Sequence, residues 1–198
     1  MKNYTILPCS KVPQWSDVPT LEIDYELIPM PHNVKAFAQL RYDEKALYVR
    51  LFAKETNIRA ELTGPLDEIC DDSCLEFFFG PIESDSRYFN FEVNPNGAMY
   101  IGFGSSVNNL QRLVQKGTKI CPIVTTTDDG WSVEYAISHD FVRLFFPDYN
   151  PAAGKAIRAN CYKCADKSDH PHWLCWNIIP REIDTFHCPE HYGIMYFA

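Results

Sequence analysis

Residues 71–103 constrain the fold more than any other part of the sequence, because their side chains alternate with a period of two. Between residues 74 and 79, and again between residues 88 and 94, every second side chain is a large apolar one. An Asn-Pro-Asn-Gly sequence at residues 94–97 then favours a tight hairpin turn, since Asn and Gly tolerate positive φ and Pro fixes its own φ. Residues 98–103 are expected to return as the partner strand. This pattern predicts a β-sheet with one face packed in a core.

The opposite face of this predicted sheet carries polar side chains in the middle of its strands. Glu76, Glu92 and Asn94 all fall on it. Thr, Ser or Lys would keep such a face soluble equally well, so these residue types indicate more than solubility. We therefore interpret this face as the working surface of the protein.

Similar alternating segments, separated by turns, recur along the rest of the chain. Residues 104–118 are predicted to be a long connection, and Ser138 is predicted to cap a short helix that runs to residue 145. The expected strands are residues 21–28, 34–42, 46–53, 74–79, 88–94, 98–103, 119–126, 131–137, 156–165, 172–178 and 191–197. About ten strands, one or two short helices and no internal repeat predict an all-β protein, a single antiparallel β-sandwich domain over residues 1–198.

Charge and composition exclude several classes of partner. A formal net charge of −8 argues against nucleic acid and anionic membranes, because both bind clustered Lys and Arg. No apolar run approaches the roughly 20 residues that span a bilayer. Residues 1–15 hold no long apolar stretch, so we expect a cytoplasmic protein, or a secreted one if a leader has been removed. The eight cysteines are expected to be buried, reduced thiols.

Several motifs follow one another along residues 34–198: DDSCLEFFFGP, YFNFEVNPNG, WSVEYAI, IRANCYKCAD, HPHWLCWN and FHCPEHYG. In this order they resemble the carbohydrate-binding module family 9-like group, within the wider DOMON-like β-sandwiches. The resemblance implies a jelly-roll-like sandwich that binds sugars and has no catalytic machinery. It also implies that two Trp side chains clamp a terminal sugar, aided by charged and amide side chains.

Either Trp173 or Trp176 matches the late clamp position of that resemblance. They are three residues apart in a predicted strand, so they are expected to point to opposite faces, and only one can be a sugar platform. No Trp precedes Cys74, where a second clamp would be expected; Ile69 and Cys70 stand there. The predicted sugar contacts supply aromatic faces and hydrogen-bonding groups. They are Trp173, Trp176, Glu76, Glu92, Asn94, Tyr100, Arg158, Asn160, Lys163 and His172.

A second interpretation is a structural, redox-sensitive or zinc-binding protein that uses the Cys/His-rich C-terminal third. Cys161 and Cys164 have the spacing of a zinc knuckle. In a strand, however, they would face opposite ways. The weak zinc candidates are Cys161, Cys164, Cys175, His187, Cys188 and His191.

Three further possibilities receive less support from the residues. Glu76 and Glu92 match the two carboxyls of a weak glycoside hydrolase, but a shallow sheet face is not expected to desolvate the acid. Some relatives bind calcium, and the candidate ligands for it here are Asp71 and Asp72. We favour a turn-capping role for these two residues. Haem also occurs among relatives, yet the Met and His spacings single out no axial pair. The prediction is therefore a non-catalytic carbohydrate-binding protein.

Overall fold

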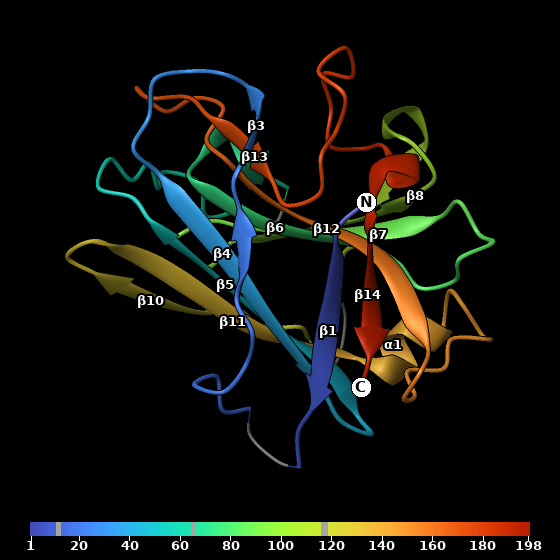
Figure 1. Ribbon diagram of the computed structural model, residues 1–198. Coiled ribbons are helices and arrows are strands. Elements are labelled where there is room, and N and C mark those ends of the chain that lie inside the picture. Colours follow the sequence, from blue (N-terminus) through green and yellow to red (C-terminus); the bar gives the residue numbers. More distant parts are fainter. Residues whose placement is uncertain (11–12, 65, 116–118) are drawn as a thin grey trace.

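The computed structural model describes residues 1–10, 13–64, 66–115 and 119–198, and nearly all of its regular structure is β-sheet (Figure 1). Its strands are β1 (Asn3–Pro8), β2 (Leu21–Ile23), β3 (Tyr25–Ile28), β4 (Lys35–Tyr42), β5 (Ala46–Lys54), β6 (Cys74–Gly80), β7 (Tyr88–Val93), β8 (Met99–Gly104), β9 (Leu110–Arg112), β10 (Ile123–Thr127), β11 (Gly130–Ser138), β12 (Ala156–Cys164), β13 (Trp173–Cys175) and β14 (Gly193–Phe197). The helical elements are α1 (His139–Arg143) and the 3₁₀ turns η1 (Ile69–Asp71), η2 (Val107–Asn109) and η3 (Pro189–His191).

The strands form one curled sheet in the order β10-β11-β5-β4-β1-β14-β12-β6-β7-β8-β9. Beside this path, β2 pairs with β4, and β13 pairs with both β12 and β3. The first strand joins the two halves, because β1 pairs with β14 through residues 3–6 and with β4 through residues 7–8 (Figure 1).

The all-β prediction is confirmed, but the expectation of a wholly antiparallel sandwich is wrong at this junction. Both pairings of β1 are parallel. The sequence pattern of residues 1–20 predicted only an extended segment there. The structure also places β9 within residues 104–118, which were expected to be a connection. The jelly-roll and DOMON-like details stay predictions.

The core lies between the two halves of the curled sheet and follows the predicted alternation. Leu75, Phe77 and Phe79 of β6 are fully buried, and Phe89 and Phe91 of β7 join them. Because such side chains remove a large apolar area from water, each contributes roughly 1.5–3 kcal/mol. The period-two reading of this region is therefore confirmed on its apolar face.

Two local predictions, a hairpin turn at residues 94–97 and a helix cap at Ser138, are also confirmed. The N–H of Gly97 donates to the Asn94 carbonyl over 2.9 Å, and Gly97 has a φ of 75°. Ser138 Oγ accepts from the Phe141 N–H over 3.1 Å at the start of α1. No helix among the described residues is long and apolar enough to cross a membrane.

The polar face of the central strands is less open than the sequence suggested. Every residue of β6 and β7 is buried, on both faces. A second apolar cluster covers part of this face with side chains from residues 175–192, which periodicity could not place. Its buried members are Leu27, Phe78, Tyr88, Tyr162, Cys175, Ile179, Cys188 and Tyr192.

Candidate functional site

The two late tryptophans lie on opposite sides of the sheet, as their spacing predicted. Trp176 is 3% exposed and belongs to the main core. It packs so closely on Gly193 that a Cβ added there would lie 2.5 Å from the indole ring. Trp173 is half-buried and faces a pocket. Only Trp173 is therefore available as a platform.

The pocket beside Trp173, which we call the Trp173 pocket, has a volume of about 170 Å³. Pockets for drug-sized ligands span roughly 300–1,000 Å³, so this one suits a single small ring. It combines two aromatic side chains with several carboxyls. Its lining is Leu27, Ile28, Cys70, Glu76, Glu92, Cys164, Asp166, Trp173, Asp184, Thr185, Phe186 and His187.

Strand pairing fixes the backbone of Trp173, and a hydrogen bond fixes its indole ring. In β13, residue 173 pairs with Cys164 of β12 and with Ile28 of β3, next to an irregularity in register. Such irregularities re-aim side chains. The Trp173 Nε1–H donates to Asp166 Oδ1 over 2.8 Å, and the Asp166 N–H donates to the Cys70 carbonyl over 2.9 Å. The ring orientation is thus fixed before any ligand arrives.

Phe186 supplies a second aromatic side chain to the pocket. One of its faces stacks on Tyr162, with ring centroids 4.1 Å apart and an interplanar angle of 15°. Sequence reasoning missed Phe186 because it lies in an irregular segment after β13, where periodicity gives no signal. Its place within the FHCPEHYG motif was the one available hint.

Glu76 and Glu92 form the polar floor of this pocket. They are direct cross-strand partners on β6 and β7, and they are 2% and 7% exposed. The Cys164 thiol donates to Glu76 Oε1 over 2.9 Å, and the Asn90 amide donates to Glu92 Oε1 over 2.7 Å. Within the described residues neither carboxyl makes an ion pair.

Burial governs the protonation of both carboxyls. Desolvation raises the pKa of Glu76 to about 8, against the hydrogen bond from Cys164. Desolvation, and next the proximity of Glu76, raise the pKa of Glu92 well above its usual value. Both groups are therefore largely uncharged at neutral pH and can donate as well as accept hydrogen bonds.

This raised pKa predicts a pH-dependent stability. The folded state holds a proton on Glu76 that the unfolded chain has lost, so the free energy of unfolding should fall as pH rises from 6.5 to 8. Burial lowers the pKa values of His172 and His187 to about 4 in the folded state, so their titration in the unfolded chain adds an opposite trend near pH 6.5, which the wild type and the variant share. Urea unfolding should show a shallower fall in Glu76→Gln than in the wild type. The exposed Glu44→Gln is the control, and an unchanged slope in Glu76→Gln would contradict the assignment.

The expectation that this face would not desolvate a carboxyl is wrong, since both glutamates are buried.

Three of the predicted sugar contacts are instead occupied in holding loops to the sheet. The Asn94 amide donates to the Leu62 carbonyl and to Asp72 Oδ2, over 2.8 and 2.9 Å. The Asn160 amide donates to the Asn177 carbonyl over 3.0 Å. Arg158 donates to backbone carbonyls of residues 85 and 189. We leave these residues outside the site because their polar groups are already used.

Lys163 and His172 are buried on the other side of β12. The Lys163 ammonium lies 3.2 Å from Glu55 Oε1, donates to the Cys164 carbonyl over 2.7 Å, and lies 2.8 Å from His172 Nε2. Their residue types suggested ligand contacts. Instead, both side chains lie beside Glu55, which comes from a distant part of the chain. Neither lines the Trp173 pocket.

Tyr100 lies next to the site without lining the pocket. It is half-buried, packs in a small cluster with Trp173 and Phe186, and has the Arg112 guanidinium 4.4 Å above its ring. Burial, followed by the charge of Glu92, raises the pKa of Tyr100. Its hydroxyl stays protonated at neutral pH.

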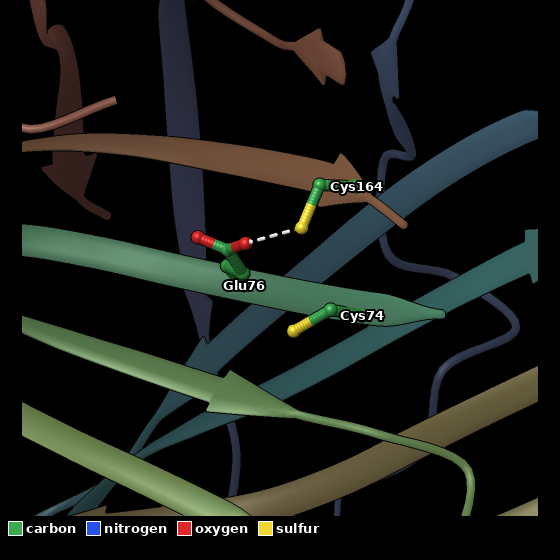
Figure 2. A group of neighbouring side chains, drawn as sticks. All are labelled: Cys74, Glu76 and Cys164. Carbon is green, nitrogen blue, oxygen red and sulfur yellow. Dashed lines mark hydrogen bonds between the residues drawn. The ribbon is translucent and has the colours of Figure 1, made fainter. Parts of the chain in front are cut away.

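The six zinc candidates do not converge. Cys161 points into the main core, whereas Cys164 points to the Trp173 pocket, as their spacing on a strand predicted. Cys175 and Cys188 belong to the second apolar cluster, and His187 pairs with the Tyr88 hydroxyl over 2.8 Å. Among the described residues, the one group of three ligand-type side chains close enough to share an ion is a different one: Cys74, Glu76 and Cys164 (Figure 2).

Asp71 and Asp72 do not fit a calcium ion. Asp72 Oδ2 accepts from the N–H groups of Glu61 and Leu62 over 2.9 and 2.8 Å, and its other oxygen lies 3.3 Å from Arg59. Asp71 pairs with Lys167. Calcium takes six to eight free oxygens, so these carboxylates serve the loop. Calcium binding stays an untested expectation of the resemblance.

A larger groove, of about 1000 Å³, lies on the other half of the sheet. Its lining includes Trp15, whose indole N–H donates to Glu134 over 2.8 Å. Its lining is largely apolar, and two of its carboxyls are already engaged, since Asp43 accepts from the Lys45 and Ala46 N–H groups and Glu134 also pairs with Arg50. It supplies a matched site for control substitutions.

Comparison with known proteins finds the same fold in solved structures. A solved structure of a candidate carbohydrate-binding protein from Bacteroides uniformis ATCC 8492 is similar over 100% of this chain and 99% of its own, with 24% identity and a TM-score of 0.85. Two structures of a family 9 carbohydrate-binding module from Caldicellulosiruptor kristjanssonii are also similar. The complex with glucose has 14% identity and a TM-score of 0.69, covering 100% of this chain and 96% of its own. The complex with cellotriose has 15% identity and a TM-score of 0.68, covering 99% and 93%.

No curated protein matches the chain. The family comparison is decisive, because a sequence model described as carbohydrate-binding family 9 matches residues 22–197, most of the chain. The protein belongs to carbohydrate-binding family 9.

Proposed function

We propose that the protein binds a carbohydrate without catalysis, and that the terminal ring of an oligosaccharide sits in the Trp173 pocket. One observation carries the proposal. The half-buried indole of Trp173, oriented by Asp166, lies beside two buried carboxyls, Glu76 and Glu92. Membership of the family supports carbohydrate as the ligand class and a binding role rather than catalysis.

The chemistry of the pocket suits a pyranose. The C–H face of the ring can stack on an aromatic side chain, which Trp173 offers and Phe186 can complement. Protonated carboxyls both donate and accept, which matches vicinal hydroxyls that do the same. The volume of about 170 Å³ admits one ring, so the remainder of a longer sugar would stay outside.

Titration calorimetry with cello-, xylo- and manno-oligosaccharides tests this proposal. We expect a glucose-based sugar to bind, since the neighbours from Caldicellulosiruptor kristjanssonii hold glucose and cellotriose. Trp173→Ala should bind it roughly two- to tenfold more weakly, because an aromatic contact contributes about 0.5–1.5 kcal/mol beyond its buried area.

Trp15→Ala is the matched control, with the same change at a half-buried tryptophan in the larger groove. It should bind like the wild type. Absence of heat with every sugar at high concentration would contradict carbohydrate binding. Loss of binding in Trp15→Ala but not in Trp173→Ala would move the site to the other half of the sheet.

A further inference from the structure

Two cysteines and a glutamate lie close together (Figure 2), and two of the three, Cys164 and Glu76, line the Trp173 pocket. Cys74 on β6 and Cys164 on β12 are direct cross-strand partners, and Glu76 follows two residues along β6, on the same face. Their three ligand atoms lie within 4.8 Å of one another, and Cys164 Sγ is 2.9 Å from Glu76 Oε1. The side chains of this thiol cluster therefore converge on one point.

The thiol cluster is buried, and its carboxyl makes no ion pair within the described residues. Cys74, Cys164 and Glu76 are 0%, 1% and 2% exposed. Within the described residues, no Lys, Arg or His pairs with Glu76, and the carboxyls of Glu92 and Asp166 lie nearby. Lys163 lies close by, but its ammonium pairs with Glu55, so a bound cation would add positive charge to a group of buried acidic side chains.

A divalent cation would replace the protons of the Cys74 and Cys164 thiols, so binding would release protons.

We propose that Cys74, Cys164 and Glu76 bind a thiophilic divalent cation, with zinc as the first candidate. Two thiolates and one carboxylate are ligands that zinc accepts, whereas calcium and magnesium prefer oxygen alone. In a tetrahedral zinc site the ligand atoms lie roughly 3.5–3.8 Å apart, a spacing that small side-chain rotations of this cluster can reach.

The site would keep one coordination position open. Cys164 and Glu76 line the pocket, so an ion could enter through it and a ligand atom from the pocket could complete the tetrahedron. The zinc-knuckle prediction named Cys164 but paired it with Cys161, which faces the core. In the structure, the cysteine opposite Cys164 on the neighbouring strand is Cys74.

Titration of the reduced, metal-free full-length protein with Cd²⁺, followed by Zn²⁺ competition, tests the proposal. Thiolate-to-cadmium absorption should appear and saturate at a single equivalent, and Zn²⁺ should displace the cadmium. Cys74→Ala and Cys164→Ala should each lose the absorption. Glu76→Gln should weaken zinc binding by roughly tenfold or more.

Cys161→Ala is the matched control, since it removes a buried thiol from the opposite face of the same strand. It should keep the absorption. The wild type alone gives a second readout that does not depend on variants folding: zinc should release protons and protect two cysteines from alkylation, identified by mass spectrometry as Cys74 and Cys164.

Three results would overturn the proposal: no cadmium absorption in the reduced wild type, absorption that survives both Cys74→Ala and Cys164→Ala, or absorption lost in Cys161→Ala. A disulfide between the two cross-strand cysteines, with no cadmium binding after reduction, would also overturn it. The inference does not rest on the sugar proposal, because sugar titration of the metal-free protein has its own outcome.

Discussion

Replacement of Lys163 by methionine is expected to lower the free energy of unfolding by about 3–5 kcal/mol. Lys163 and Glu55 are 0% and 3% exposed, and their charges face each other over 3.2 Å. Removing the ammonium leaves Glu55 as a buried, unpaired charge. It would retain only the hydrogen bonds from Ser73 Oγ and Trp131 Nε1, at 2.9 Å each. Urea unfolding at neutral pH measures the loss.

The neighbouring histidine provides an independent readout of the same change. His172 Nδ1 lies 2.8 Å from the His170 carbonyl, and Nε2 faces the Lys163 ammonium. A carbonyl can only accept and an ammonium can only donate, so His172 is neutral with its proton on Nδ1. Burial, and next the charge of Lys163, lower the pKa of His172 to about 4. In Lys163→Met this pKa should rise, as nuclear magnetic resonance titration would show.

The control for this prediction is the double variant Lys163→Met/Glu55→Gln, which removes both charges and should recover most of the lost stability. Sugar affinity should be unchanged in Lys163→Met measured under folding conditions, because Lys163 does not line the Trp173 pocket. A loss of stability below about 1 kcal/mol would contradict the buried pair, since only exposed pairs contribute so little.

Trp176→Ala is expected to destabilise the protein by about 3–5 kcal/mol, the usual range for removing a buried Trp side chain. Trp176 lies in the main core against Gly193, whereas the half-buried Trp173 should cost less when truncated. Denaturant midpoints of Trp176→Ala and Trp173→Ala measure the difference. The two variants should thus show opposite profiles, with stability lost in one and sugar affinity in the other.

Gly193→Ala tests the same contact from its other side. The added Cβ would meet the indole at 2.5 Å and the Lys2 carbonyl at 2.9 Å, so the single variant should be destabilised. Part of that cost should vanish in the Trp176→Ala background, where the indole is gone. Equal midpoints for Trp176→Ala and the wild type would refute the core placement.

Period-two reasoning predicted those parts of the structure that depend on neighbours along one strand. It placed Leu75, Phe77 and Phe79 in the core and separated Trp173 from Trp176. Strand spacing carries this information, because adjacent side chains must point to opposite faces.

The sequence could not reveal which distant segment covers or occupies a side chain. Lys163 has the chemistry of a sugar contact, but Glu55 reaches it through the fold. Phe186 enters the pocket from an irregular segment, and Glu76 became buried because residues 175–192 fold over its sheet face. Such contacts depend on tertiary packing, which local pattern does not encode.

The way β1 closes the sheet has a consequence for the order in which the protein can fold. Asn3 pairs with Ile194, so residues 3–6 of β1 must wait for β14, almost the whole length of this chain later, before their partner strand exists. Contacts between residues so distant in sequence form slowly, because the intervening chain must first lose much of its freedom. Until β14 is synthesised, β1 and β12 would therefore each present an unpaired strand edge, and chaperone dependence should be greatest at that stage.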